Sequence, residues 1–261
     1  MATAAGAADL DIIHAPEIRL SSQSVAQGWY IRGDLGYGGW MRTDKPSYRV
    51  DALGGVLARG NFDTARFSGP VSYGAGMGYQ FNNFVRADLT ADFSNGKLKA
   101  SSEYGSPCIG GPAGTTCSAT HRASYSAAHL LANGYVDLGT FAGITPYVGA
   151  GLGVTYMNWG NLKTDVACRN GTAGCGGATF SAPAVSGEND WRFTYALMAG
   201  AAVDLTERVK LDIGYRFTDM DGGKAFGDTV TVPGLGAASV SASDKGFRKH
   251  EIRAGIRVAT W

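Results

Sequence analysis

Fourteen ionisable side chains recur at alternate positions within six short stretches of the chain, and the positions between them are mostly apolar. Carboxylates placed among guanidinium groups can catalyse proton transfer, or they can neutralise one another in a buried network. Seven of these residues are basic and seven acidic, and this balance favours mutual neutralisation. The set consists of Arg32, Asp34, Arg86, Asp88, Asp92, Asp137, Arg192, Asp204, Lys210, Asp212, Arg216, Glu251, Arg253 and Arg257.

Nucleophilic catalysis would need a base within hydrogen-bonding reach of a nucleophile. His129 is the only histidine at the polar positions of these stretches, and Ser124 and Ser126 have the opposite parity. We therefore interpret His129 as a buried structural histidine and expect neither a catalytic residue, nor a metal, nor a cofactor. A lipid-modifying enzyme is the less favoured alternative.

The four cysteines lie in two segments rich in Gly, Pro, Thr and Asn. Eight residues separate Cys108 from Cys117 and six separate Cys168 from Cys175, whereas zinc sites use C-x2–4-C pairs. Short local disulfides are typical of oxidising compartments. The sequence therefore predicts the disulfides Cys108–Cys117 and Cys168–Cys175 in an exported protein.

The ionisable residues belong to segments that alternate apolar and polar side chains, which is the period of a half-buried β-strand. The longest apolar run is about nine residues, at 195–203, and a transmembrane helix needs about 20. Strands are therefore the elements expected to cross a membrane. The predicted strands are 29–37, 71–80, 85–93, 129–138, 148–155, 192–204, 209–217 and 251–258.

Tight turns and long polar connections alternate between these strands, and the long connections are roughly 25–30 residues each. Such one-sided loops are typical of outer-membrane barrels of Gram-negative bacteria. We predict an all-β fold: an eight-stranded antiparallel transmembrane up-and-down β-barrel over residues 28–261, with four long extracellular loops. The loops are predicted at 44–65, 95–122, 158–190 and 219–246.

The charged parity must face the barrel interior, because Arg or Lys on the lipid face near the midplane costs about 2–4 kcal/mol. An eight-stranded interior is filled by side chains or holds one small ligand, so we expect ion pairs to plug the lumen. Arg86 is expected to pair with Asp88 or Asp92. Aromatic girdles at the two membrane interfaces are predicted from Trp29, Trp40, Phe81, Phe84, Phe141, Tyr156, Trp159, Trp191, Phe217 and Phe247.

Four segments carry a resemblance to a known family: GWYIRGDLG at 28–36, LANGYVDL at 131–138, TPYVGAGLG at 145–153 and HEIRAGI at 250–256. They resemble the small outer-membrane β-barrels related to the OmpA membrane domain, especially the alphaproteobacterial porin-family and surface-antigen branch. The resemblance covers the strands, about half of the chain. It implies a structural, surface-exposed protein that supports envelope integrity and surface contacts.

The last strand departs from that family, whose members end with an aromatic residue in phase with the apolar positions. Here the parity of Ile252 and Ile256 predicts Thr260 at that place, and Trp261 lies one residue beyond. The exact register of this strand is therefore open.

The N-terminal segment and the loops suggest partners. Ala5-Gly6-Ala7 fits a signal-peptidase site, so residues 1–7 are expected to be a signal-peptide remnant or added leader, and 8–27 a periplasmic tail. The resemblance implies a peptidoglycan link through Ala8, because some members of the family are joined to peptidoglycan by an N-terminal alanine. Further expected partners are outer-membrane lipid, lipopolysaccharide, and a neighbouring barrel or lipoprotein. The net charge of +1 gives no reason to expect nucleic acid. A loop-mediated adhesin or ligand receptor and a narrow porin are alternative functions.

Overall fold

The computed structural model describes residues 27–42, 45–52, 54–104, 114–169, 179–232 and 236–260. Every regular element in these ranges is a β-strand, and they contain no helix long and apolar enough to span a bilayer. The strands are β1 (Gly28–Arg42), β2 (Ser47–Ala52), β3 (Gly55–Asn61), β4 (Thr64–Ser68), β5 (Val71–Gln80), β6 (Val85–Tyr104), β7 (Thr116–Asp137), β8 (Ile144–Trp159), β9 (Lys163–Arg169), β10 (Thr179–Ser181), β11 (Asn189–Asp204), β12 (Val209–Val232) and β13 (Gly236–Ala259).

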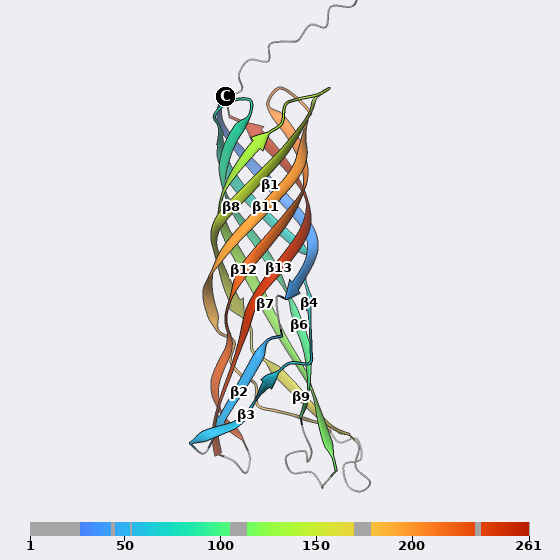
Figure 1. Ribbon diagram of the computed structural model, residues 1–261, viewed down its shortest axis with the longest axis vertical. Helices are drawn as coiled ribbons and strands as arrows, with labels where there is room; N and C mark the ends of the chain where they lie inside the picture. Colours follow the sequence, from blue (N-terminus) through green and yellow to red (C-terminus); the bar gives the residue numbers. More distant parts are fainter. Residues whose placement is uncertain are drawn as a thin grey trace, which may run out of the picture.

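Eight strands form a closed antiparallel ring in the order β1, β5, β6, β7, β8, β11, β12 and β13. The β13–β1 pairing joins Tyr30 to Ala259 at one end and Arg42 to Phe247 at the other, and the β6–β7 pairing completes the circuit. Figure 1 shows the resulting elongated barrel with strongly tilted strands. The predicted eight-stranded up-and-down barrel is confirmed, and each predicted strand lies within a ring strand, except that 129–138 extends one residue beyond the end of β7.

The two faces of the ring strands differ as the alternation predicted. Along β7, each residue facing the interior is buried and each residue between them is exposed over most of the strand. On β1, Ile31 and Leu35 are 54% and 64% exposed, whereas Asp34 is 5% exposed. The exposed apolar side chains form the surface that lipid covers, so the charged side chains are kept out of the hydrocarbon.

The extracellular part contains far more strand than predicted. β6 and β7 remain paired from Val85↔Val136 to Tyr104↔Cys117, and β12 and β13 remain paired as far as Val232↔Gly236. The long regions predicted as loops at 95–122 and 219–246 are therefore mostly β-hairpin. The sequence pattern concealed these extensions because their outward residues, such as Lys97 and Lys99, are polar, so that the apolar alternation ends although the strand continues.

The remaining strands add to these extensions. β2 pairs with β13 and β3 with β2, whereas β4 pairs with β6. At the other edge of the β6–β7 hairpin, β9 pairs with β7 and β10 with β9. Figure 1 shows β2, β3 and β9 at the end of the barrel opposite the C-terminus. The extracellular half is thus a folded β-structure that continues the barrel.

Candidate functional site

The centre of the lumen holds a group of charges that come from three different strands. The Asp92 carboxylate on β6 accepts hydrogen bonds from Arg216 Nη1 on β12 at 2.7 Å and from Arg253 Nη2 on β13 at 2.6 Å. All three residues are buried. Charge-assisted contacts of this length are among the stronger hydrogen bonds. They join strands that are not neighbours in the ring, so they fix the cross-section of the barrel.

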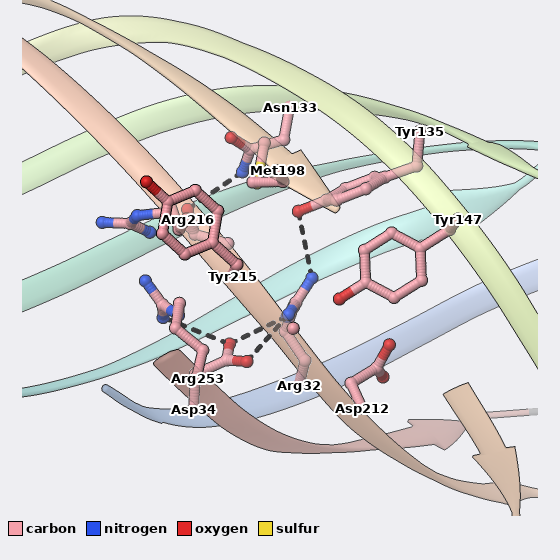
Figure 2. Close-up of a pocket in the computed structure, with 12 residues that line it drawn as sticks. Arg32, Asp34, Asn133, Tyr135, Tyr147, Met198, Asp212, Tyr215, Arg216 and Arg253 are labelled. Atoms are coloured by element: carbon pink, nitrogen blue, oxygen red, sulfur yellow. Dashed lines mark hydrogen bonds and ion pairs between the residues drawn. The ribbon is translucent and has the colours of Figure 1, made fainter. Parts of the chain in front are cut away.

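A second group surrounds Arg32 on β1. Its Nη2 lies 2.7 Å from Asp34 Oδ1 and its Nη1 lies 2.8 Å from Asp88 Oδ2. Asp88 also accepts hydrogen bonds from Tyr30 Oη at 3.0 Å and from Asn133 Nδ2 at 2.8 Å. Figure 2 shows Arg32 between Asp34 and Tyr135, with Arg253 on the other side of Asp34. The carboxylates of this group are therefore fully partnered.

The predicted ion-pair partner of Arg86 was wrong. Its Nε donates to Asp137 Oδ1 at 3.1 Å, and not to Asp88 or Asp92, which pair with other arginines. The cross-strand neighbour of Arg86 is Tyr135 on β7, and Asp137 lies two residues farther along the same face. The ion pair thus forms diagonally between strands, a geometry that parity alone does not show.

Two further pairs lie toward the periplasmic end. Arg257 Nε is 3.4 Å from Asp212 Oδ2, and Lys210 Nζ is 2.5 Å from Asp204 Oδ1. The second pair is partly exposed, as expected at the mouth of the barrel. With these pairs, thirteen of the fourteen residues predicted for the network contact an opposite charge within that set. They are Arg32, Asp34, Arg86, Asp88, Asp92, Asp137, Asp204, Lys210, Asp212, Arg216, Glu251, Arg253 and Arg257.

Sequence reasoning missed two charged members of the lumen. Lys249 Nζ lies 2.5 Å from Glu251 Oε1, and Asp244 Oδ1 accepts a hydrogen bond from Arg192 Nη1 at 2.9 Å. Lys249 could have been found by extending the inward parity of β13 back by two residues. Asp244 could not, because Gly246 (φ 103°) lies between it and the regular part of β13, and the inward parity changes there.

Inward glycines leave room for these side chains. A Cβ atom added at Gly74 would lie 2.2 Å from Asp92 Oδ1, and one at Gly255 would lie 2.2 Å from Asp34 Oδ1. Both distances are far shorter than a non-bonded contact allows. Glycine therefore occurs on the charged parity where a carboxylate from the next strand crosses the position.

His129 is a buried polar residue of the lumen and the cross-strand partner of Asp92. Its Nδ1 is hydrogen-bonded to Thr155 Oγ1 at 2.7 Å, and its ring stacks on Trp40 with centroids 6.0 Å apart. Ser124 and Ser126 point to the opposite, exposed side of β7. The structure therefore does not bring His129 together with either serine, and the histidine has the structural surroundings that were predicted.

An apolar cluster fills the barrel beyond the charged groups. It contains Phe62 and four further large rings, Tyr125, Trp159, Phe226 and Phe247, and the Trp159 ring lies about 5–6 Å between centroids from each of the other three. The predicted interfacial position of three aromatic residues was wrong. Trp159 and Phe247 are 3% and 1% exposed inside this cluster, and Trp40 packs against it.

The free space in the lumen is small. One cavity, lined by Arg32, Tyr135, Tyr147, Asp212 and Arg216 among others, has a volume of about 20 Å³ and is shown in Figure 2. A second cavity of the same volume lies within the apolar cluster. A space of this size can hold a water molecule, and it is too small for an organic ligand.

Two sets of predicted residues can be placed only in part. Cys117 and Cys168 are opposite one another on β7 and β9, and neither is a free thiol. Cys108 and Cys175 lie outside the described residues, so the two predicted pairings remain predictions. The tail at 8–27 with Ala8 and the last residue, Trp261, also lie outside them, apart from Gln27.

Sequence comparison shows similarity to an outer-membrane family over nearly the whole chain. The family model for the outer membrane protein beta-barrel domain matches residues 2–256. A protein of Brucella abortus is 36% identical over 98% of this chain and 92% of its own length. A Rickettsia massiliae protein with the name "Putative adhesin" is 30% identical over 91% of this chain and 92% of its own length.

Solved structures of similar fold have much lower sequence identity. Neisserial surface protein A is 17% identical with a TM-score of 0.42, covering 89% of this chain and 97% of its own. OprG from Pseudomonas aeruginosa is 15% identical with a TM-score of 0.47, covering 91% and 99%. The family match, which spans nearly all eight ring strands, agrees with the closed ring and its apolar outer surface: this chain belongs to the outer-membrane β-barrel domain family and is located in the outer membrane of a Gram-negative bacterium.

Proposed function

We propose that this protein is a non-conducting surface protein that presents a rigid extracellular β-structure for contact with other surfaces. The observation that carries this proposal is the apolar cluster above the lumen charges. Phe62 from the segment between β3 and β4 belongs to this cluster, and its ring packs against His121 on the ring strand β7 and Tyr48 on β2, with centroids 4.9 Å and 5.4 Å away. The extracellular strands are thereby held in one arrangement, and binding would not need to order them first.

The blocked lumen argues against the narrow-porin alternative. Ion pairs between Asp92, Arg216 and Arg253 cross the barrel, and the apolar cluster lies over them. A solute would have to break buried ion pairs, and leaving one such charge unpaired costs about 3–5 kcal/mol. Transport through the unaltered lumen is therefore not the activity that this geometry favours.

An adhesive function is supported by the relatives from Rickettsia, whose names describe them as candidate adhesins and which match over most of their length. We infer that the contact surface includes the β2–β3 hairpin, which exposes Val56 near its tip and Arg59 farther along β3. A structural role in the envelope, including a peptidoglycan link through Ala8, is compatible with this function.

The test is attachment of a non-adherent Gram-negative host that displays the barrel. Expression of the unaltered protein should raise attachment to cultured epithelial cells several-fold over the empty vector. The combined change Val56→Glu and Arg59→Glu in this hairpin should lower this gain by half or more. The matched control, Glu207→Ala with Arg208→Ala in the periplasmic turn, should leave it unchanged. An unaltered barrel that reaches the surface without increasing attachment would refute the proposal.

A further inference from the structure

Four basic residues form a row on the outer surface of the extracellular extension. Arg66 on β4 is the cross-strand partner of Lys99 on β6, Lys99 is the partner of Arg122 on β7, and Arg122 is the partner of Lys163 on β9. All four side chains are exposed. Lys97 lies two residues from Lys99 on the same face of β6. We call these five residues the cationic row.

The cationic row lies just outside the part of the barrel that lipid covers. On β6 the apolar outward residues end at Phe93, which is 48% exposed, and Lys97 follows four residues later on the same face. Four residues of strand span about 13 Å, which at a tilt of 35–45° is roughly 10 Å of height. The row therefore lies at the level of the headgroups and first sugars of the outer leaflet.

The charges of the row are poorly compensated by the protein itself. Like charges directly opposite one another on neighbouring strands destabilise a sheet. Arg122 has an ion-pair partner, Asp165, at 2.5 Å. Within the part of the chain that the structure describes, Arg66, Lys99 and Lys163 have no ion pair. An anion from outside the protein would therefore reduce the electrostatic repulsion between these side chains.

The other side of the barrel has a different charge at this level. On β12 the outward apolar residues end at Phe217, and the next two outward positions are Asp219 and Asp221. Asp219 pairs with Arg248 on β13 at 2.9 Å. The row on β4, β6, β7 and β9, which lie together in the extracellular half (Figure 1), thus has no counterpart on the face formed by β12 and β13.

We propose that the cationic row binds the phosphate groups of a glycolipid of the outer leaflet. Neighbouring strands are about 4.8 Å apart, so the four positions from Arg66 to Lys163 span about 14 Å, which is enough for more than one phosphate group. The apolar surface directly below the row would contact the acyl chains of the same molecule. This inference does not depend on the proposed adhesive function, because its ligand belongs to the bacterium's own membrane.

The test measures binding of lipid A to the purified full-length barrel by native mass spectrometry. Lipid A that carries both phosphates should bind at least 10-fold more tightly than the same lipid with its phosphates removed. The combined change Arg66→Gln, Lys99→Gln and Lys163→Gln should abolish this preference. A matched control, Arg49→Gln, Arg208→Gln and Arg248→Gln, removes the same charge elsewhere and should stay within 2-fold of the unaltered protein.

Three outcomes would overturn the proposal: equal binding of the two forms of lipid A, an unchanged preference in the row variant, or a row-dependent affinity for heparin with none for phosphorylated lipid A. The last would assign the row to a sulfated glycan instead of a lipid. Circular dichroism should verify that each variant retains the β-barrel. The attachment assay is a separate measurement, so failure of either idea can be recognised without the other.

Discussion

Arg86 and Asp137 form an ion pair inside the barrel in which the two side chains are 0% and 4% exposed. The guanidinium carbon of Arg86 also lies 3.9 Å from the ring centroid of Tyr135 and 4.7 Å from that of Tyr147. The arginine is therefore held between two aromatic rings and a carboxylate. Loss of this side chain would leave Asp137 with a buried charge and no cation beside it.

The first prediction concerns the stability of this pair. Arg86→Ala should lower the free energy of unfolding by about 3–5 kcal/mol, the cost of leaving one partner of a buried pair uncompensated. Arg49→Ala removes an arginine whose side chain is 56% exposed in its pair with Asp51, and should lower stability far less because solvent screens this pair. Urea-dependent folding into lipid vesicles measures both values. Equal losses for the two variants would contradict a buried network.

The second prediction concerns conduction. Because Asp92, Arg216 and Arg253 cross the lumen and an apolar cluster lies over them, the purified barrel should show no stable steps of conductance in planar bilayers. Flotation with lipid vesicles provides the control that the protein has inserted. A large, steady, porin-like current from inserted protein would mean that the lumen is not blocked.

The alternation of residues was sufficient to predict the ring and the direction of its side chains, because lipid imposes a strict distinction between the two faces of each strand. Asp92 and Glu251 were placed inside for that reason alone. The partners within the lumen could not be predicted. Whether Arg86 reaches Asp137 or Asp88 depends on the offset between strands, and parity contains no information about this offset.

The extracellular half was harder to predict because water is present on its outer face and the apolar cluster fills its inside. Trp159 and Phe247 occur near the ends of the apolar stretches, where interfacial aromatic residues are expected. Both residues have the inward parity of their strands, and because the strands continue beyond the lipid this parity places both rings in the interior. A pattern of apolar inward residues and polar outward ones, as in Leu98 and Ala100 alternating with Lys97 and Lys99, was the signal that could have shown it.

The third prediction concerns the topology. Arg59 is exposed on β3, whereas Glu207 is exposed in the short turn between β11 and β12. A membrane-impermeant maleimide added to intact cells should label Arg59→Cys and should label Glu207→Cys only after the outer membrane is permeabilised. Labelling of Glu207→Cys in intact cells, together with protection of Arg59→Cys, would reverse the orientation.

The fourth prediction concerns the cysteines. We expect Cys108–Cys117 and Cys168–Cys175, because each pair is close in sequence and an oxidising compartment favours their formation. Peptide mapping by mass spectrometry under non-reducing conditions should recover each pair within one connected fragment. Since Cys117 and Cys168 are opposite one another on adjacent strands, a peptide that joins the β7 segment to the β9 segment would contradict this connectivity.

The last prediction concerns His121, which lies beyond the lipid-covered part of β7. Its ring is hydrogen-bonded to Ser102 Oγ at 2.8 Å and Thr164 Oγ1 at 2.9 Å, and it packs edge-on against Phe62. Burial lowers the pKa of His121 to about 4 from 6.5. The unfolded segment therefore binds a proton that the folded one does not bind between these values, and stability falls as the pH falls from about 6.5 to about 4.

Hydrogen exchange can detect this effect in the amides of β9 and of the extracellular part of β6, which flank His121. Their protection should decrease as the pH is lowered through that window, after correction for the intrinsic pH dependence of exchange. In His121→Gln, which keeps a polar side chain but does not titrate, the decrease should be smaller. The amides of β1 in the membrane provide an internal reference. An identical pH dependence in the two proteins would show that other groups govern the loss, because only the histidine differs between them.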